Sequence, residues 1–424
     1  MSVADLAIVA ALVFGWGTLS ARLERFDVTA PITFVLAGLL LTHGPLAVLG
    51  FQPSNTLIKD LAEFTLALVL FSDASRVGLH ELRADSGLYL RLLGVALPLT
   101  IALGTVLALA LTSTSIWLAL LVGAALAPTD AALGAGMMAN PVVPARIRRL
   151  INVESGLNDG IATPVVSVAI AGVAGGHGHG PAAAVAELAV GVLVGVAVGG
   201  VGGLLVNAAR RRGWAAEGFG GAAVLGLALC AYASAVAMHG NGFIAAFVAG
   251  LAFGTAGGRR GEPLVPFVEE TGALVSLLVW LAFGAVELVP AVESLTWQMV
   301  LYAILSLTVV RMVPVLAALT GARLDWATSI LVAWFGPRGL ASVVFALLAL
   351  EELGRPTAGR AVAVITITVV ISVVAHGATA EPLARRYANR LARPAAGSTA
   401  VQPPDVPDRR LIRHKARRGI TPHG

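Results

Sequence analysis

The chain has 424 residues, of which 57% are hydrophobic and only 12% are charged, and its mean hydropathy is +0.85. Soluble globular proteins carry about 25% charged residues, so the composition excludes that class and predicts a polytopic membrane protein. The single cysteine, Cys230, excludes a disulfide framework and a cysteine metal cluster, and the net charge of +5 does not indicate nucleic acid, because most basic residues lie in short loops and the tail.

A membrane-spanning helix needs about 20 apolar residues. The apolar runs between charged or Gly/Pro-rich breaks predict an all-α protein with about thirteen such spans. Their expected ranges are 3–21, 30–48, 56–74, 88–112, 116–139, 149–173, 183–208, 217–238, 241–257, 266–290, 297–320, 325–350 and 359–380.

The charges of the loops predict the orientation. Alternate loops are rich in arginine, whereas the intervening loops carry little Lys or Arg apart from Arg355 and Arg360. By the positive-inside rule, the arginine loops and the C-terminus face the cytoplasm and the N-terminus lies outside the cell inner (plasma) membrane. An odd number of spans requires this arrangement. The loops contain Arg22 and Arg25; Arg76 and Arg83; Arg146, Arg148 and Arg149; Arg210, Arg211 and Arg212; Arg259 and Arg260; and Arg323.

The sixth predicted span carries the most informative residues, the run V-E-S-G-L-N-D-G at 153–160. A carboxylate at mid-depth in hydrocarbon costs about 2.5–3.5 kcal/mol or more. On a helix, Ser155 and Asp159 share one face, and Glu154 and Asn158 share the adjacent one. A buried network that only fixes helix packing is the alternative, but an ion site explains the two carboxylates better.

Further polar residues fall inside predicted spans. The fifth span is interrupted by A-P-T-D, which ends in Thr129 and Asp130, and the twelfth by G-P-R-G, which contains Arg338. Neither can be a continuous helix. Arg311 lies in the eleventh span and Asp73 near the cytoplasmic end of the third. At 1.5 Å per residue, most of these charges lie about 13–18 Å from the cytoplasmic boundary, near the middle of the hydrocarbon layer.

The positions of the two broken spans indicate an internal repeat. Spans 1–6 and 8–13 predict two inverted six-helix repeats, about 1–175 and 217–385, joined by a linker helix near 183–208. The fifth and twelfth spans are then partners that cross, and paired discontinuous helices are the best sequence pointer to a transporter's binding site. We expect Asp130 to balance exposed helix N-termini there and Arg338 the C-termini.

The chain therefore divides into a transmembrane domain, 1–385, and a basic tail, 386–424. The tail is rich in Arg, Pro and Gly and lacks an apolar period. We expect it to be disordered and cytoplasmic.

These residues carry a family resemblance over about 1–385. The chain resembles the monovalent cation/proton antiporters, the branch of NhaP-like bacterial sodium/proton antiporters and animal sodium/proton exchangers. The most specific stretch is E-S-G-L-N-D at 154–159, which looks like the sixth-helix signature E-S-x-L-N-D. Other stretches are similar to further family motifs: Thr129-Asp130 to the unwound T-D of the fifth helix, G-P-R-G at 336–339 to G-x-R-G, Arg311 to the eleventh-helix arginine, and F-S-D-A at 71–74 to the third-helix F-E-A/D-G.

The resemblance implies that Asp159 binds either the cation, Na⁺, or the proton. Ser155, the backbone at Thr129, and Asp130 would complete or orient the site. Asn158 stands where the electrogenic branch has a second aspartate.

The resemblance also implies that Glu154 pairs with Arg311 to hold the core together, while it leaves the role of Asp73 open. Members of this family usually form homodimers and serve pH homeostasis.

The expected function is secondary antiport of Na⁺ or Li⁺ against H⁺ without a cofactor. An oxygen-lined site with one carboxylate suits a hard monovalent cation, and poor solvation favours the protonated carboxyl group. Cation and proton then compete for Asp159, while rocking of one bundle against the other alternates access. The Asn158 amide cannot titrate, which predicts electroneutral one-for-one exchange.

Three alternatives remain open at this point. A K⁺/H⁺ antiporter would share the fold. A channel would need a continuous polar pore, whereas the charges gather at one depth. An intramembrane aspartyl protease would use Asp130 and Asp159 as a dyad, but the chain lacks the G-x-G-D context of such enzymes.

Overall fold

The computed structural model describes residues 3–23, 28–43, 55–77, 85–112, 114–134, 137, 143–175 and 181–391, and every regular element among them is helical. The longer helices and their interruptions are α1 (Val3–Leu23), α2 (Ala30–His43), α3 (Asn55–Arg76), α5 (Ser86–Tyr89), η2 (Leu90–Ala96), α6 (Leu97–Thr112), α7 (Ile116–Ala125), η3 (Ala131–Gly134), α9 (Ala145–Ala174), α10 (Pro181–Arg211), α11 (Gly220–Ala237), α12 (Gly242–Gly261), α13 (Val265–Val286), α14 (Leu288–Glu293), α15 (Trp297–Leu305), η6 (Ser306–Val310), α16 (Arg311–Leu319), α17 (Trp326–Trp334), α18 (Leu340–Leu353) and α19 (Arg355–Leu391).

The predicted spans fall on these helices. Eight helices in the described ranges are long and apolar enough to cross a membrane alone, and Ala30–His43, Ile116–Ala125 and Gly242–Gly258 are shorter apolar helices. The fifth and twelfth spans are interrupted as predicted, because α7 ends at Ala125 and a non-helical segment separates α17 from α18. The all-α membrane fold is thus confirmed, while the count of thirteen spans stays a prediction.

The last helix is longer than predicted. α19 continues to Leu391, past the expected start of the tail at 386. Its final turns are highly charged but still helical, and an ion pair between Arg385 and Glu381 joins neighbouring turns of this segment. Residues 392–424, the rest of the predicted tail, lie outside the described residues.

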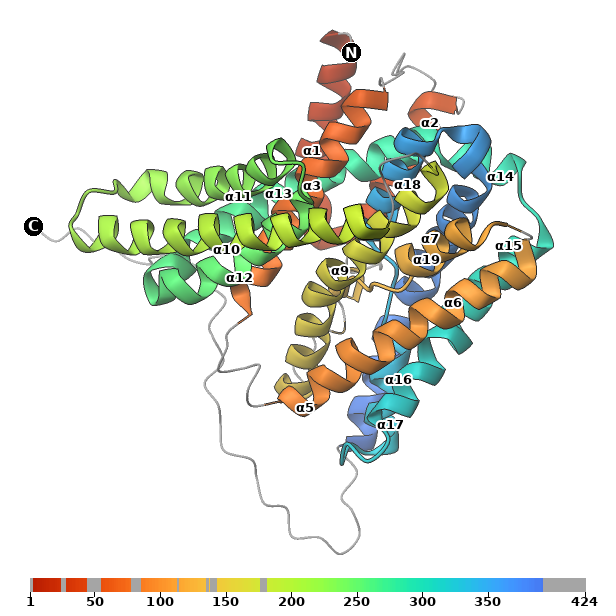
Figure 1. Ribbon diagram of the computed structural model, residues 1–424. Coiled ribbons are helices and arrows are strands. Elements are labelled where there is room, and N and C mark those ends of the chain that lie inside the picture. Colours follow the sequence, from red (N-terminus) through yellow and green to blue (C-terminus); the bar gives the residue numbers. More distant parts are fainter. Residues whose placement is uncertain are drawn as a thin grey trace, which may run out of the picture.

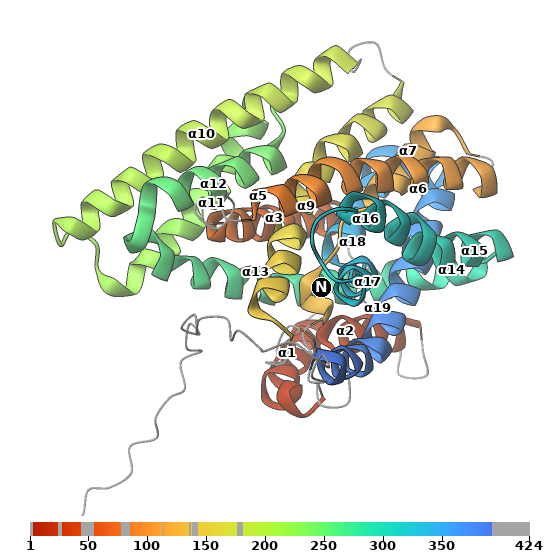
Figure 2. The same ribbon diagram turned by 90° about the horizontal axis from the view of Figure 1, so that it is seen from below.

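Two groups of helices lie side by side (Figures 1 and 2). The first contains α10, α11, α12 and α13, with α3 packed against α12 and α13. The second contains α6, α7, α9 and α15 to α19. α9 belongs to the second group and also contacts α3 and α12, so it lies where the groups meet.

Helix contacts recur in the two halves, as inverted repeats require. α3 packs on α12 as α2 packs on α13, and α7 packs on α9 as α18 packs on α19. The fourth and eleventh spans each contain a π-helical segment, η2 and η6, and α16 packs against η2. Local widening of a helix often marks a functional site, and here it occurs in repeat-related spans beside the broken ones.

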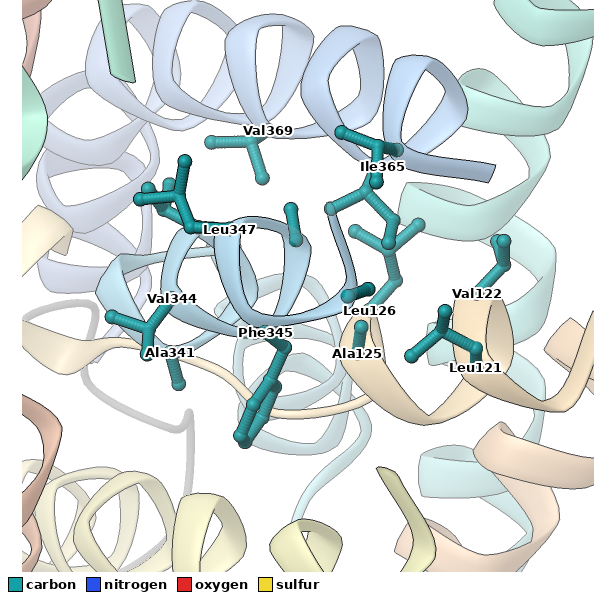
Figure 3. Close-up of a cluster of buried hydrophobic side chains, with 14 of the residues drawn as sticks. Leu121, Val122, Ala125, Leu126, Ala341, Val344, Phe345, Leu347, Ile365 and Val369 are labelled. Atoms are coloured by element: carbon teal, nitrogen blue, oxygen red, sulfur yellow. The ribbon is translucent and has the colours of Figure 1, made fainter. Parts of the chain in front are cut away.

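An apolar core surrounds the broken spans (Figure 3). Leu121 and Val122 from α7, Val344 and Phe345 from α18, and Ile365 from α19 are buried together. Each half-helix therefore buries its apolar side chains against α19. This packing holds the two interruptions in place from one side.

Candidate functional site

The two interrupted spans cross at their non-helical segments. Pro128 and Pro337 lie in these segments, where each lacks the backbone N–H that a continuous helix needs. The Asp130 N–H donates to the Pro337 carbonyl oxygen at 2.8 Å. The crossing of the fifth and twelfth spans is therefore made through the backbone itself.

Two side chains satisfy the helix ends that the crossing exposes. The Arg338 guanidinium donates to the carbonyl oxygens of Ala127 at 2.8 Å and Pro128 at 3.1 Å, just past the C-terminus of α7. The Asp130 carboxylate accepts from the Leu340 N–H at 3.4 Å, at the N-terminus of α18. Cations are stabilised at helix C-termini and anions at N-termini. Both charges lie at the ends where we expected them.

Two glycines make room for these charges. A Cβ at Gly336 would lie 2.7 Å from Arg311 Nε, and a Cβ at Gly339 would overlap with Asp130 Cβ. Because contacts under about 3 Å are sterically excluded, the crossing requires glycine on both sides of Arg338. The G-P-R-G stretch is thus explained by close approach of backbone to side chain.

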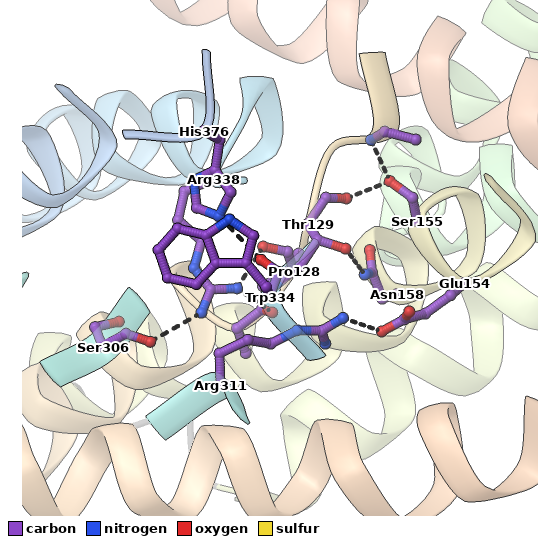
Figure 4. Close-up of polar contacts among 12 residues, drawn as sticks. Pro128, Thr129, Glu154, Ser155, Asn158, Ser306, Arg311, Trp334, Arg338 and His376 are labelled. Carbon is purple, nitrogen blue, oxygen red and sulfur yellow. Dashed lines mark hydrogen bonds and ion pairs between the residues drawn. The ribbon is translucent and has the colours of Figure 1, made fainter. Parts of the chain in front are cut away.

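α9 places the polar run of the sixth span against the interrupted α7 span (Figure 4). Ser155 Oγ donates to the Thr129 carbonyl oxygen at 2.5 Å and accepts from the Ala131 N–H at 2.8 Å. The Asn158 amide donates to Thr129 Oγ1 at 2.8 Å. The two Ser155 bonds satisfy backbone groups that the unwinding leaves without helical partners, while the Asn158 bond fixes the Thr129 side chain.

Asp159 lies one turn beyond Ser155 on the same face of α9 and is 8% exposed. No hydrogen bond from another described residue reaches its carboxylate. The neighbouring Asn158 Oδ1 is also buried without a hydrogen-bond partner. The site thus presents a carboxylate and an amide oxygen whose acceptor capacity is unused by the described residues.

Asp73 comes closer to the site than its position near the end of α3 suggests. A Cβ at Gly156 would lie 3.1 Å from Asp73 Cβ, so the aspartate packs directly on α9. Asp73, Asp130 and Asp159 interact electrostatically, yet among the described residues no group of three His, Cys, Asp or Glu side chains could share one metal ion.

Glu154 and Arg311 form an ion pair, with Arg311 Nη2 2.7 Å from Glu154 Oε1. The two side chains are 3% and 1% exposed. Figure 4 shows the pair beneath the crossing. The pair joins α9 to α16 and holds two opposite charges out of solvent.

Sequence reasoning missed a polar chain behind the crossing. Ser372 Oγ accepts from the Arg338 N–H at 2.7 Å and lies 3.2 Å from His376 Nδ1. His376 Nε2 lies 3.1 Å from the Trp334 carbonyl oxygen at the end of α17, and the two rings stack. His376 Nδ1 also lies 2.9 Å from the Ser372 carbonyl oxygen, so each ring nitrogen faces a backbone acceptor, and the tautomer decides which carbonyl oxygen receives the N–H.

These hydrogen bonds connect α19 to both sides of the interruption in the twelfth span, at Trp334 and at Arg338. The one signal for them was a lone histidine inside the last predicted span, near its C-terminal end, because ionisable residues inside a membrane are rare and are functional candidates by default. Its serine partner has no pattern that sets it apart from other small residues in the span.

Removing one member of the buried ion pair is predicted to destabilise the protein strongly. Arg311→Met or Glu154→Leu should each lower the free energy of unfolding by about 3–5 kcal/mol, because each leaves an uncompensated buried charge. Thermal unfolding of purified protein in detergent measures this. The double variant should regain part of the loss, whereas simple addition of the two effects would show that the residues do not interact.

Loss of the imidazole is predicted to loosen the crossing. His376→Leu removes the hydrogen bonds to Trp334 and Ser372 and should lower the unfolding free energy by about 1–3 kcal/mol. His376→Gln retains a donor and an acceptor and should recover part of the lost unfolding free energy. Equal unfolding temperatures for His376→Leu and the unmodified protein would show that the chain does not contribute to stability.

Sequence comparison matches the chain to one protein family. The family model described as "Sodium/hydrogen exchanger, transmembrane" matches residues 8–386. Two relatives, the Uncharacterized Na(+)/H(+) exchangers of Mycobacterium bovis and Mycobacterium tuberculosis, are 30% identical to this chain over 215 residues. The aligned part is 49% of this chain and 36% of each relative. The match thus covers about a third of the length of these relatives.

Structural comparison agrees. The sodium proton antiporter MjNhaP1 from Methanocaldococcus jannaschii at pH 8 has a TM-score of 0.73 with 17% identity, over 91% of this chain and 98% of that one. At this identity the likeness shows the fold. The match of the family model to nearly the whole helical region shows more: the chain belongs to the sodium/hydrogen exchanger family.

Proposed function

We propose that the chain exchanges Na⁺ or Li⁺ for H⁺ across the membrane, one for one, with Asp159 as the group that both ions share. The observation that carries this proposal is the buried Asp159 carboxylate on α9, which accepts no hydrogen bond from the other described residues. A buried carboxylate is unfavourable unless it is neutralised. A proton and a monovalent cation each supply that neutralisation, so the two compete.

Neutral oxygens beside the aspartate complete a site for a hard cation. Asn158 Oδ1 is buried and has no hydrogen-bond partner. Thr129 Oγ1 accepts from the Asn158 amide, which leaves its remaining acceptor capacity available. Ser155 bridges the Thr129 carbonyl and the Ala131 N–H, so we assign it to orient the unwound segment rather than to bind the ion first.

Four other charges around the site are matched within the protein, and Asp73 is a further carboxylate that packs on α9 nearby. Glu154 neutralises Arg311, while Asp130 and Arg338 lie at opposite helix ends that stabilise their charged forms. Asp159 is then the group whose proton is exchanged. Access to it would alternate as the bundle that contains α7, α9 and α18 moves against the bundle of α10 to α13.

The whole-protein properties complete the proposal. We place the chain in the cell inner membrane as a homodimer, with the N-terminus outside and the C-terminus in the cytoplasm, where it would serve pH homeostasis. The family and fold are those of a secondary transporter, which gives the aspartyl protease alternative no support. K⁺/H⁺ exchange is the second candidate, and proton movement in vesicles supplied with Na⁺, Li⁺ or K⁺ separates the two.

Asp159→Asn is predicted to abolish cation-coupled proton flux. The amide is nearly the same size but can neither release a proton nor carry the charge that a cation neutralises. Flux is measured in proteoliposomes with a pH-sensitive dye after addition of Na⁺. Glu293→Gln, which removes an exposed carboxylate of α14, is the matched control and should exchange normally. Normal exchange by folded Asp159→Asn would exclude Asp159 as the shared group.

Exchange is predicted to be electroneutral. One proton leaves the Asp159 site for each monovalent cation that binds there, because Asn158 cannot titrate and Arg338 keeps its proton. Proteoliposomes clamped at opposite membrane potentials should therefore show equal rates and the same final pH.

A final pH that moves with the imposed potential would contradict this stoichiometry and indicate a second titrating group. Asp130→Asn would then test the first suspect. If Asp130 only balances the N-terminus of α18, this variant remains electroneutral even where its rate falls.

A further inference from the structure

A groove lies between α16, α17 and the C-terminal turns of α19, and Asp159 is not among the residues that line it. Its volume is about 510 Å³, within the range of small-ligand pockets. Met312, Ile330, Leu331 and Leu383 line its sides and Trp334 its wall. In Figure 1 these helices meet at the foot of the molecule, beside the start of α9.

The polar groups in and beside the groove bond to one another. Trp334 Nε1 donates to Thr379 Oγ1 at 3.1 Å, and the Tyr387 hydroxyl lies 2.7 Å from Thr328 Oγ1. Neither pair needs a ligand for its hydrogen bonds. The groove thus offers an occupant chiefly apolar surface, which suits a hydrocarbon chain.

The mouth of the groove is positively charged. Arg386 and Arg390 line it from successive turns of α19 and are exposed, and neither forms an ion pair with another described residue. Arg385 instead pairs with Glu381 on its own helix. α19 has 37 residues, so it is about 55 Å long and extends beyond a hydrocarbon layer about 30 Å thick. Its charged end therefore reaches the level of the lipid headgroups.

We propose that this groove binds one anionic phospholipid, with an acyl chain between α17 and α19 and the phosphate between Arg386 and Arg390. Guanidinium groups form charge-assisted hydrogen bonds to phosphate, and basic segments at the membrane edge attract anionic lipids. The chain's own residues 392–424 do not suit the mouth, because they contain more Arg and Lys than Asp and Glu. The groove is also too small for a second helix, whose diameter is about 10 Å.

The bound lipid would act on the half-helix that leads to the crossing. Trp334 lines the groove and ends α17, and its carbonyl oxygen faces His376. An acyl chain that fills the groove would pack α17 against α19. It would so stabilise the end of α17, which leads into the non-helical segment that contains Arg338. The lipid site is distinct from the ion site, and binding is measurable without transport.

The experiment uses full-length protein in nanodiscs of phosphatidylcholine with increasing phosphatidylglycerol. Native mass spectrometry should show one retained phosphatidylglycerol per chain, and the unfolding temperature should rise with its fraction. Arg386→Gln with Arg390→Gln should weaken this binding about tenfold, which corresponds to the loss of about 1.4 kcal/mol. Arg386→Gln alone should already weaken the binding, and Arg385→Gln, which likewise removes one arginine charge one residue away, is its matched control and should bind like the unmodified protein.

A second arm tests the acyl chain. Ala327 lines the groove, so Ala327→Phe should reduce phosphatidylglycerol retention, while glycerol phosphate, which has no acyl chain, should not raise the unfolding temperature. Equal retention by the double arginine variant and the Arg385→Gln control would overturn the proposal. So would equal stabilisation by phosphatidylcholine, which would indicate ordinary surrounding lipid, or by glycerol phosphate, which would indicate a free phosphate site.

Discussion

Two spans are interrupted at the same place in the membrane, and the backbone groups that lose their helical partners must be satisfied without water. The rest of the site follows from this constraint. Arg338 takes the carbonyl oxygens that α7 leaves, and Asp130 meets the amide at the start of α18. Ser155 on α9 bonds to the Thr129 carbonyl oxygen and to the Ala131 N–H. One hydroxyl and two opposite charges thus make non-helical backbone tolerable in a bilayer.

The charged residues of the site differ in whether the protein itself neutralises them. Glu154 is matched by Arg311 at 2.7 Å, and the charges of Asp130 and Arg338 are matched by helix ends. Asp159 has no such match among the described residues. A carboxylate in this position is neutralised by whatever reaches it from solution, which makes it suitable for exchange rather than for stability.

Much of this arrangement could be predicted from the sequence. Buried charges in apolar spans are conspicuous because they are unfavourable, and proline inside a span marks an interruption, so the crossing and the pair of Glu154 with Arg311 could be anticipated. The extension of α19 to Leu391 could not be predicted. Residues 386–391 are as highly charged as a solvated tail, although their helix propensity still permits a helix. Nor could the contact of Asp73 with α9 be predicted, because it depends on the missing side chain of Gly156.

Asn158 connects the charge of the site to its geometry. Its amide nitrogen donates to Thr129 Oγ1, and so helps to fix the unwound segment, while its oxygen remains buried and without a partner. An aspartate at this position could only accept from Thr129 when ionised, so the hydroxyl would have to reverse its role. The same substitution would add a second titrating group. Under the proposed one-for-one exchange, the residue that limits exchange to one proton would therefore also hold the Thr129 side chain, and a change of stoichiometry would require a different hydrogen-bond arrangement at the crossing.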